Sequence, residues 1–378
     1  MITYWQVAAG SSGRDYSSQF LQYGLAFVGE PHRPAMDLIK PGDVLLLKQG
    51  LSKLTAVGRA VERDGKCVGF GEKQWLRDFD GWDLPSYCNV EWYVPDVPVQ
   101  TKGLTRATIQ KVNQQHLVDL ANQVLDEVEA DFILVFDPPP TRPVDDTQIL
   151  RFLIREGLRP ALAEDLTTAF RRIRLLANYY YDCGYPWSDL SEHETRTFLI
   201  MPLLMALGWA EQQVKIELAV KRGRIDVACF ARPYRKDAKG DANNADCVLL
   251  LDSKDFSSGL DNAPDQVKAY AEHFSSCQVI AVSNGYCYKT YRRTKDGFST
   301  TPDAYLNILR PQDRYPLDPK AVDGCLAVLR HLLPHSWSQG SQTYRSQTGA
   351  IMSKEVLDRA DADGALRRAE IALMLEEE

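Results

Sequence analysis

A run of prolines divides this chain more firmly than any other feature of its sequence. The segment 138–143 reads Pro-Pro-Pro-Thr-Arg-Pro. Prolines in series lack the N–H groups that a helix or a sheet ladder needs, so this segment predicts a linker. At roughly 150 residues per domain, a chain of 378 residues is long enough for two or three domains. We therefore predict separately folded parts on either side of the linker.

The part before the linker has the pattern of a β-barrel domain over residues 1–103. Three stretches are apolar or alternate between apolar and polar residues, as expected of strands: 43–48, 54–61 and 89–94. The pair Asp64-Gly65 favours a tight turn. This turn predicts a hairpin between the second of these strands and a returning strand at 67–70.

Helical and mixed patterns follow, so the predicted fold class is α/β (α+β) with several domains. Residues 104–185 form a helical connector, because apolar residues recur every three to five positions in 105–128 and a second helical stretch covers 147–181. Residues 186–310 alternate between helix and strand, which predicts a mixed sheet flanked by helices. A helical C-terminal tail is predicted for 311–378.

Composition excludes several classes of protein. Hydrophobic residues make up 44% and charged residues 25% of the chain, as in ordinary globular proteins and unlike disordered ones. No apolar run reaches the roughly 18 residues of a membrane-spanning helix, and the N-terminus lacks a signal-peptide pattern. The eight cysteines include no Cys-x-x-Cys pair. We therefore expect reduced thiols, no structural zinc and a cytoplasmic location.

The net charge of −7 argues against nonspecific coating of nucleic acid, because affinity for phosphate comes from Lys and Arg. The charge is uneven, however. Residues 171–174 (Arg-Arg-Ile-Arg) and 291–295 (Tyr-Arg-Arg-Thr-Lys) are basic. A nucleic-acid enzyme with local basic patches is compatible with this distribution.

The clearest chemical signal lies in the α/β domain. Asp226 lies in one predicted strand, and Asp252 ends a neighbouring strand in which residues 248–251 are all apolar. Lys254 follows two residues later, so on an extended chain its side chain points to the same face as that of Asp252. Two carboxylates beside an ammonium group suit Mg²⁺, with Mn²⁺ as an alternative ion. The ion would polarise a phosphoryl oxygen and activate water, while Lys254 would assist the nucleophile.

Three further residues are candidates for the same site. Glu194, at the start of a helix, would complete the metal shell or orient water. Ser191 and Glu194 also have the spacing of a capping box, which is a structural alternative. Gln266 and Tyr270 are four residues apart and share one face of the next predicted helix, from which they would contact the scissile phosphate or shape the site.

These residues resemble a known family in their order: Glu194, Asp226, Asp252-Ser253-Lys254 and Gln266-x-x-x-Tyr270. The order is similar to that of the PD-(D/E)XK nuclease superfamily, and in particular the nuclease domain of type I restriction subunits. There, a Glu-x-Arg sequence opens a helix that ends in Leu-Gly-Trp, matched here at 194–196 and 207–209. Ile225 and Asp252 depart from the usual Pro and Glu. The resemblance covers about a third of the chain. It implies a restriction-endonuclease-like fold with Asp226, Asp252 and Glu194 as metal ligands.

The N-terminal domain resembles the EVE and PUA-like β-barrels in the stretches 4–10, 41–48 and 56–61. Such domains hold a flipped or modified base between aromatic rings. By this resemblance, the residues expected around a modified base are Trp5, Ser11, Arg14, Tyr16, Trp75, Trp82 and Trp92. The alternative is that these tryptophans form the core of a small barrel.

Together the resemblances imply a modification-dependent DNA endonuclease of the restriction or phage-defence type. The N-terminal domain would recognise a modified base in double-stranded DNA, and the α/β domain would hydrolyse phosphodiester bonds. Because one site cuts one strand, double-strand cleavage predicts a homodimer, at least on DNA. The residues expected to hold the DNA backbone are Lys221, Arg222, Arg224, Arg292 and Arg293.

Two alternatives remain open. In the first, the N-terminal domain binds a small signalling nucleotide or a partner protein that gates the nuclease. In the second, the α/β domain is a scaffold in a non-catalytic nucleic-acid-binding or assembly protein. The intact set of Asp226, Asp252 and Lys254 argues against this second alternative.

Overall fold

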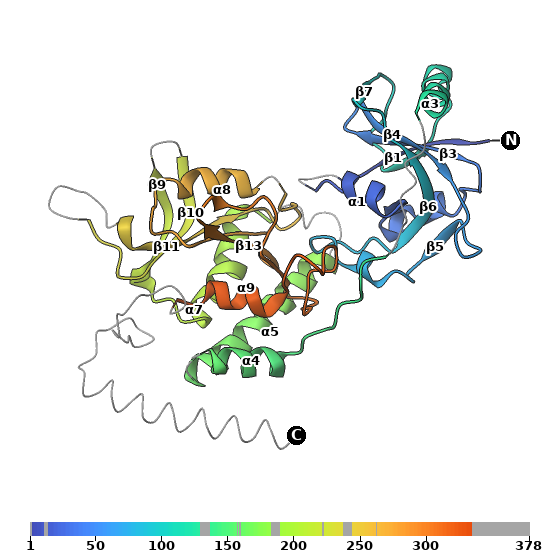
Figure 1. Ribbon diagram of the computed structural model, residues 1–378. Helices are drawn as coiled ribbons and strands as arrows, with labels where there is room; N and C mark the ends of the chain where they lie inside the picture. The colour runs from blue at the N-terminus through green and yellow to red at the C-terminus, as the bar shows by residue number, and fades with distance from the viewer. Residues whose placement is uncertain are drawn as a thin grey trace, which may run out of the picture. The chain divides into compact units, whose positions relative to one another are not determined.

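The chain forms two compact units, residues 1–140 and 141–378, each with its own β-sheet (Figure 1). The boundary lies within the predicted proline-rich linker. The computed structural model describes residues 2–10, 14–128, 137–156, 158, 160–182, 190–220, 223–236, 244–261 and 263–334. Across these ranges, no helix has both the length and the apolar character needed to cross a membrane.

The first unit is built on a curled, half-barrel sheet in the order β2-β6-β4-β3-β1-β8, with β5 beside β6 and β7 beside β4. β1 and β3 are parallel, and the other described pairs are antiparallel. Its elements are β1 (Tyr4–Ala8), α1 (Ser17–Gln22), β2 (Leu25–Val28), η1 (Glu30–His32), α2 (Arg33–Met36), β3 (Val44–Gln49), β4 (Lys53–Ala60), β5 (Val68–Phe70), η2 (Gln74–Arg77), β6 (Ser86–Tyr93), β7 (Val99–Gln100), β8 (Ile109–Lys111) and α3 (Gln115–Glu127).

The strands predicted in this unit are confirmed as β3, β4, β5 and β6, but the hairpin predicted between β4 and β5 is wrong. Asp64 and Gly65 do adopt the left-handed backbone of a tight turn, with φ of 52° and 74°. However, the strands on either side of the turn both pair with β6. β6 is eight residues long, and its first part pairs with β5 while its last part pairs with β4. Because β4 and β5 both pair with this long strand, they do not pair with each other, and the predicted hairpin does not form.

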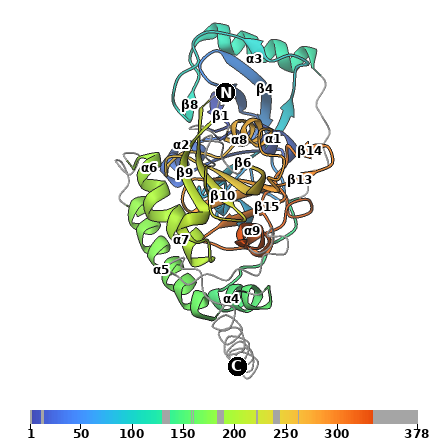
Figure 2. The ribbon, with the colours of Figure 1, turned by 90° about the vertical axis from the view of Figure 1, so that its left-hand side faces the viewer.

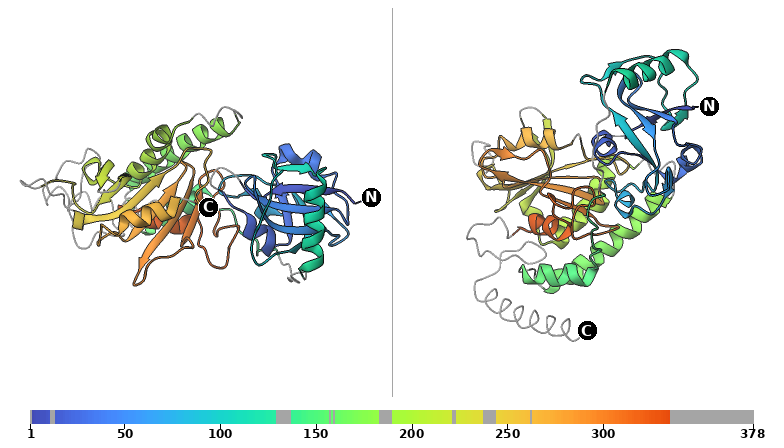
Figure 3. Two further views of the ribbon diagram at one scale, coloured as in Figure 1. Left: turned by 90° about the horizontal axis from the view of Figure 1, so that it is seen from above. Right: turned by 45° about the vertical axis from the view of Figure 1, so that its right-hand side comes forward.

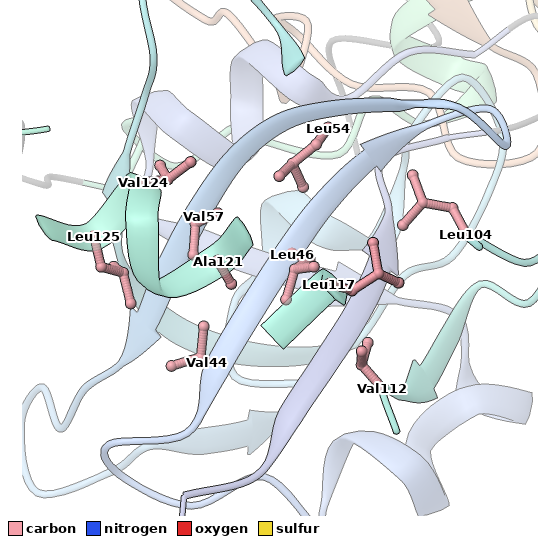
Figure 4. Packing of buried hydrophobic residues seen from close by; sticks show 10 residues of the cluster. All are labelled: Val44, Leu46, Leu54, Val57, Leu104, Val112, Leu117, Ala121, Val124 and Leu125. Carbon is pink, nitrogen blue, oxygen red and sulfur yellow. The ribbon is translucent and has the colours of Figure 1, made fainter. Parts of the chain in front are cut away.

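Helix α3 belongs to the first unit and covers one face of its sheet (Figure 4). Its apolar residues lie on one stripe of the helix and pack on residues of β3 and β4. This core cluster consists of Val44, Leu46, Leu54, Val57, Leu104, Val112, Leu117, Ala121, Val124 and Leu125. The predicted boundary at 103/104 is therefore corrected, because the helix predicted at 105–128 completes a core and does not act as a connector.

The second unit contains a mixed sheet in the order β14-β13-β12-β11-β10-β9, with β15 beside β13. β11 and β12 are parallel, and α8 connects them. Figure 1 and Figure 3 show α8 on one side of this sheet and α5 with α7 on the other. The elements are α4 (Asp146–Arg155), α5 (Pro160–Asp182), α6 (Glu192–Thr195), η4 (Arg196–Ile200), α7 (Met201–Ala206), η5 (Glu211–Gln213), β9 (Val214–Val220), β10 (Gly223–Phe230), η6 (Asn244–Asp246), β11 (Cys247–Ser253), α8 (Ala263–Ala271), β12 (Val279–Ser283), β13 (Cys287–Thr294), β14 (Gly297–Phe298), β15 (Ala304–Asn307) and α9 (Cys325–Leu332).

The second unit also extends beyond its predicted limits of 186 and 310. α5 packs against α7, and α4 packs against α9. α9 in turn packs on β13 and β15, and Trp209 donates a hydrogen bond to the carbonyl of Leu332 (2.7 Å). The second half of the predicted connector and the first part of the predicted tail are therefore parts of this unit. Residues 335–378 of the predicted tail lie outside the described residues.

Candidate active site

Two neighbouring strands bring Asp226 and Asp252 together. β10 and β11 are antiparallel, with Val227 opposite Leu251, so the two aspartates are the next pair in the same register. Residues opposite one another in a sheet project to the same face. Both aspartates are buried, with 8% and 4% of their surface exposed. Every residue of β11 is buried, so its polar end lies inside the unit and needs polar partners.

Asp226 has partners on both of its carboxylate oxygens. Oδ1 lies 2.9 Å from a guanidinium nitrogen of Arg196. Oδ2 accepts hydrogen bonds from the backbone N–H of Ser253 (2.6 Å) and from its hydroxyl (2.8 Å). Hydrogen bonds to a charged group are shorter and stronger than those between neutral groups. This set fixes the orientation of the Asp226 carboxylate.

Asp252 and Lys254 form an ion pair, with 2.6 Å between Oδ2 and Nζ. Burial raises the pKa of Asp252 to about 6, although the hydrogen bond from Lys254 acts in the opposite direction. Burial alone would lower the pKa of Lys254, but the hydrogen bond and charge of Asp252 raise it above its ordinary value. Lys254 is therefore a protonated cation at neutral pH, held next to the two aspartates.

A third carboxylate in this cluster is that of Glu192. Burial, followed by the negative charge of Asp226, raises its pKa to about 7. The hydroxyl of Ser253 lies 3.5 Å from Glu192 Oε1. Glu192 was not among the predicted residues, although one signal was present. It lies four residues before Arg196, and residues at this spacing share one face of a helix.

Glu194, which was predicted to be a metal ligand, lies elsewhere. Its carboxylate accepts hydrogen bonds from the backbone N–H (2.9 Å) and the hydroxyl (2.7 Å) of Ser191. These bonds lower its pKa, and the residue is half-buried. Together with the bond from Glu194 N–H to Ser191 Oγ they form a capping box at the start of α6. The structural alternative for Glu194 is therefore the one observed, and Glu192 occupies the position next to Asp226.

Arg196 connects Asp226 to β9. It is 3% exposed, begins a turn of π-helix (η4), and forms a second ion pair with Glu217. Glu217 has a left-handed backbone, with φ of 52°, in the middle of β9. This conformation costs a residue other than glycine about 1 to 2 kcal/mol. The surrounding structure therefore supports a strained residue whose carboxylate holds the arginine that orients Asp226.

Gln266 and Tyr270 lie beside the start of β10. The amide of Gln266 donates a hydrogen bond to the hydroxyl of Tyr270 (3.2 Å). That hydroxyl faces Gly223, where the β-carbon of any other residue would come within 2.4 Å of it. None of the contacts described for this pair is with Glu192, Asp226 or Asp252. The structure thus places the pair three residues along the strand from Asp226 and not within the carboxylate cluster.

The residues predicted to hold the DNA backbone differ in how exposed they are and in how firmly other residues already hold their side chains. Arg224 is 71% exposed, with one loose ion pair to Glu217 (3.9 Å). Arg292 is also exposed and pairs loosely with Asp303 (3.6 Å). Arg293 donates hydrogen bonds to the carbonyls of Ala271, Phe274 and Cys277, so it holds the C-terminal end of α8 and this prediction is corrected. Lys221 and Arg222 lie outside the described residues.

Most residues predicted to bind a modified base are part of the core of the first unit. Trp5 and Trp92 are buried, and their indole N–H groups bond to Asp43 (3.1 Å) and to the carbonyl of Leu25 (3.3 Å). Tyr16 and Trp75 are buried among other rings, such as Phe27 and Phe79. A small domain gains most stability by burying its largest apolar side chains, which explains this outcome.

Trp82 is the exception, because it is only half-buried. The guanidinium of Arg14 lies over its ring, 4.0 Å from the centroid, and donates a hydrogen bond to the carbonyl of Asp80 (2.9 Å). Arg14 itself is buried. Ser11 lies outside the described residues. The candidate base-binding set is thereby reduced to Trp82, with Arg14 supporting one face of the ring.

The carboxylate cluster fits a hard divalent cation by its chemistry. Mg²⁺ prefers oxygen ligands, and the raised pKa values of Glu192 and Asp252 reflect buried, mutually repelling carboxylates that a cation would stabilise. In the part of the chain that the structure describes, no three or more His, Cys, Asp and Glu residues are arranged as a ready metal site. Arg196 pairs with Oδ1 of Asp226, and Lys254 pairs with Oδ2 of Asp252. These ion pairs would have to rearrange if a cation were to bind the same oxygens.

Comparison with known proteins assigns the chain to no group. No model of a protein family matches it, and no curated protein is significantly similar to it. The functional argument therefore depends on the geometry of the site.

Proposed function

We propose that this protein is a Mg²⁺-dependent DNA endonuclease that hydrolyses phosphodiester bonds at the carboxylate cluster of the second unit. The observation that carries the proposal is the meeting of Glu192, Asp226 and Asp252 with Lys254 at the end of a buried strand. Charged groups are buried together at a cost in free energy, so such a cluster indicates chemistry more than stability.

Each residue of the cluster has a chemical role in this proposal. Asp226 and Asp252 would hold the ion, which when bound supplies Lewis-acid polarisation of a phosphoryl oxygen. Glu192, with a pKa of about 7, is suited to accept the proton of the attacking water as the bond between phosphorus and the leaving oxygen breaks. The ammonium of Lys254 would stabilise charge on the attacking water or on a phosphoryl oxygen. Arg196 positions Asp226.

We further propose that the first unit recognises the DNA, as a modification-dependent enzyme in restriction or phage defence would require. The feature that supports a reading role is Trp82, whose half-buried ring is stacked by Arg14 on one side. A base could stack on such a ring. Double-strand cleavage by a cytoplasmic homodimer, one copy per strand, completes the proposal.

One observation favours a second candidate function. Four of the expected aromatic residues are core residues, which leaves few rings for a modified base: Trp5, Tyr16, Trp75 and Trp92. In the second candidate, the nuclease site is the same, but the first unit binds a small nucleotide or a partner protein that gates cleavage.

The test is a cleavage assay on two phage DNAs, one with modified cytosines and one without. Wild-type protein is compared with Asp252→Asn and with the control Asp296→Asn, which changes an exposed aspartate in a turn. We expect Mg²⁺-dependent cleavage of modified DNA by the wild type and the control, and none by Asp252→Asn. Equal cleavage of both DNAs would support the nuclease and reject the reader. If Asp252→Asn cuts like the wild type, the proposed site is wrong.

A further inference from the structure

One face of α5 carries exposed side chains suited to nucleic acid. Leu175 and Tyr179 are 72% and 64% exposed, although such residues are usually buried. They lie four residues apart on the helix, and the exposed Arg171 and Arg172 precede Leu175 by about one turn and Tyr179 by about two. Residues at these spacings share one side of a helix. We call this set of four residues the α5 face.

The arginines of the α5 face are available to a ligand. Neither Arg171 nor Arg172 forms an ion pair with any residue that the structure describes. By contrast, Arg174 on another side of the helix pairs with Asp146 (2.7 Å) and donates to the carbonyl of Ile308 (2.8 Å). In a chain with a net charge of −7, two adjacent exposed arginines are a local exception. Their charge complements phosphate, which guanidinium groups bind well.

The C-terminal end of α5 lies beside the segment that follows Lys254. The ring of Tyr180 lies 5.5 Å from that of Phe256, which follows Lys254 by two residues. Burial, followed by the charge of Glu194 on α6, raises the pKa of Tyr180. Figure 2 shows α5 extending from α4 at one end toward α6 at the other. At 1.5 Å per residue, Arg171 and Arg172 lie about 12 to 14 Å from Tyr180 along the helix.

We infer that the α5 face binds the backbone of the DNA substrate to one side of the cleavage position. Arg171 and Arg172 contact phosphates, while Leu175 and Tyr179 contact the sugar or base faces between them and the site. This inference rests on the proposed function for the identity of the ligand. A second copy of the chain would suit the two apolar residues, but it is less suited to the arginines, because an interface that pairs this face with itself would bring like charges together.

The test measures binding of the full-length protein to a fluorescent DNA duplex by anisotropy over a range of salt concentrations. All variants carry Asp252→Asn so that the duplex stays intact. We expect Arg171→Gln/Arg172→Gln to bind roughly tenfold more weakly at 0.1 M salt, and the slope of log K against log[salt] to fall by about 2. Arg171→Lys/Arg172→Lys, which keeps both charges, should retain the slope. Arg155→Gln is the matched control, because it removes an exposed arginine of the neighbouring helix α4.

The outcomes separate this inference from the proposed function. An unchanged salt slope in the Gln variant, or a protein that binds no DNA, would overturn the inference. A lower slope in a protein that never cuts DNA would keep the inference and reject the nuclease. Sedimentation of the Leu175→Ser/Tyr179→Ser variant tests whether the α5 face binds DNA or a second copy of the chain. If this variant changes oligomeric state while DNA binding is unaffected, the face is an interface between copies and the inference is wrong.

Discussion

Each unit contains a buried cluster, of aromatic rings in the first unit and of charged groups in the second. In the first unit, Phe27 lies 4.4 Å from Phe20 and 4.7 Å from Phe79 between ring centroids. In the second unit, the buried end of β11 brings carboxylates together with Arg196 and Lys254. An aromatic ring is buried because burial removes a large apolar area from water, whereas a charge is buried only with a partner. In this molecule the buried rings form the core of the first unit, and the paired buried charges at the end of β11 form the candidate site.

The largest expected effect follows removal of the ammonium group from the cluster. Lys254→Met keeps the length of the side chain but leaves Asp252 buried without its cation. We expect the cleavage rate to fall by about 10³- to 10⁴-fold, or about 4 to 5.5 kcal/mol in barrier height. Nicking of a supercoiled plasmid measures this rate. Lys295→Met, at an exposed position, is the control, and near-normal activity of Lys254→Met would show that the buried charges serve only stability.

Unfolding experiments test the comparison for the aromatic residues of the first unit. Trp92→Ala should lower the free energy of unfolding of the first unit by about 3 to 5 kcal/mol, because the ring is buried and its N–H bonds to Leu25. Trp82→Ala should cost less than half as much, because this ring is half-buried. Urea unfolding of each variant gives the values. Equal costs would contradict the distinction between core rings and an available ring.

Glu192 and Glu194 lie two residues apart and can be compared directly. We expect an effect of intermediate size on the cleavage rate. Glu192→Gln should reduce cleavage by about 100-fold, because it removes the proposed proton acceptor of the cluster. Glu194→Gln should change cleavage by less than about twofold, since glutamine also completes a capping box. Cleavage rates at saturating Mg²⁺ test both variants. A stronger effect at Glu194 would restore the original prediction for that residue.

The smallest expected effect is a pH dependence. The pKa values of Glu192 (about 7) and Asp252 (about 6) lie above their ordinary values, so protons compete with Mg²⁺ at these carboxylates as the pH falls. At limiting Mg²⁺, cleavage should decline by up to tenfold as the pH falls from 7 to 6, where Glu192 takes up its proton, and more steeply below 6, where Asp252 does so as well. Excess Mg²⁺ should shift this decline to lower pH. A rate that rises as the pH falls would contradict the assignment of these carboxylates.

Local patterns in the sequence predicted single elements well. The apolar run before Asp252 became β11, and the helix with Gln266 and Tyr270 became α8. These predictions succeed because periodicity and turn residues act over a few neighbouring positions. The pairing of β4 and β5 with β6 could not be predicted in this way, since it depends on partners far apart in the chain.

The site was predictable in part for the same reason. Asp226 lies in the first half of β10 and Asp252 near the end of β11, with Lys254 just beyond it, so the antiparallel pairing of these two neighbouring strands brings the residues together. The choice between Glu192 and Glu194 depends on which side of α6 faces the sheet, and a capping box satisfied Glu194 locally. Whether each tryptophan is buried or available depends on the tertiary packing of the first unit, which local sequence patterns do not show.

The position of α3 has a consequence for how such a chain arises in evolution. Because α3 precedes the prolines and covers the sheet with residues such as Leu117 and Val124, the first unit contains a complete core of its own. A recombination event between α3 and α4 would leave the cores of both units intact. The proline-rich segment is thus a joint at which the first unit can be exchanged for another while the second unit is inherited unchanged.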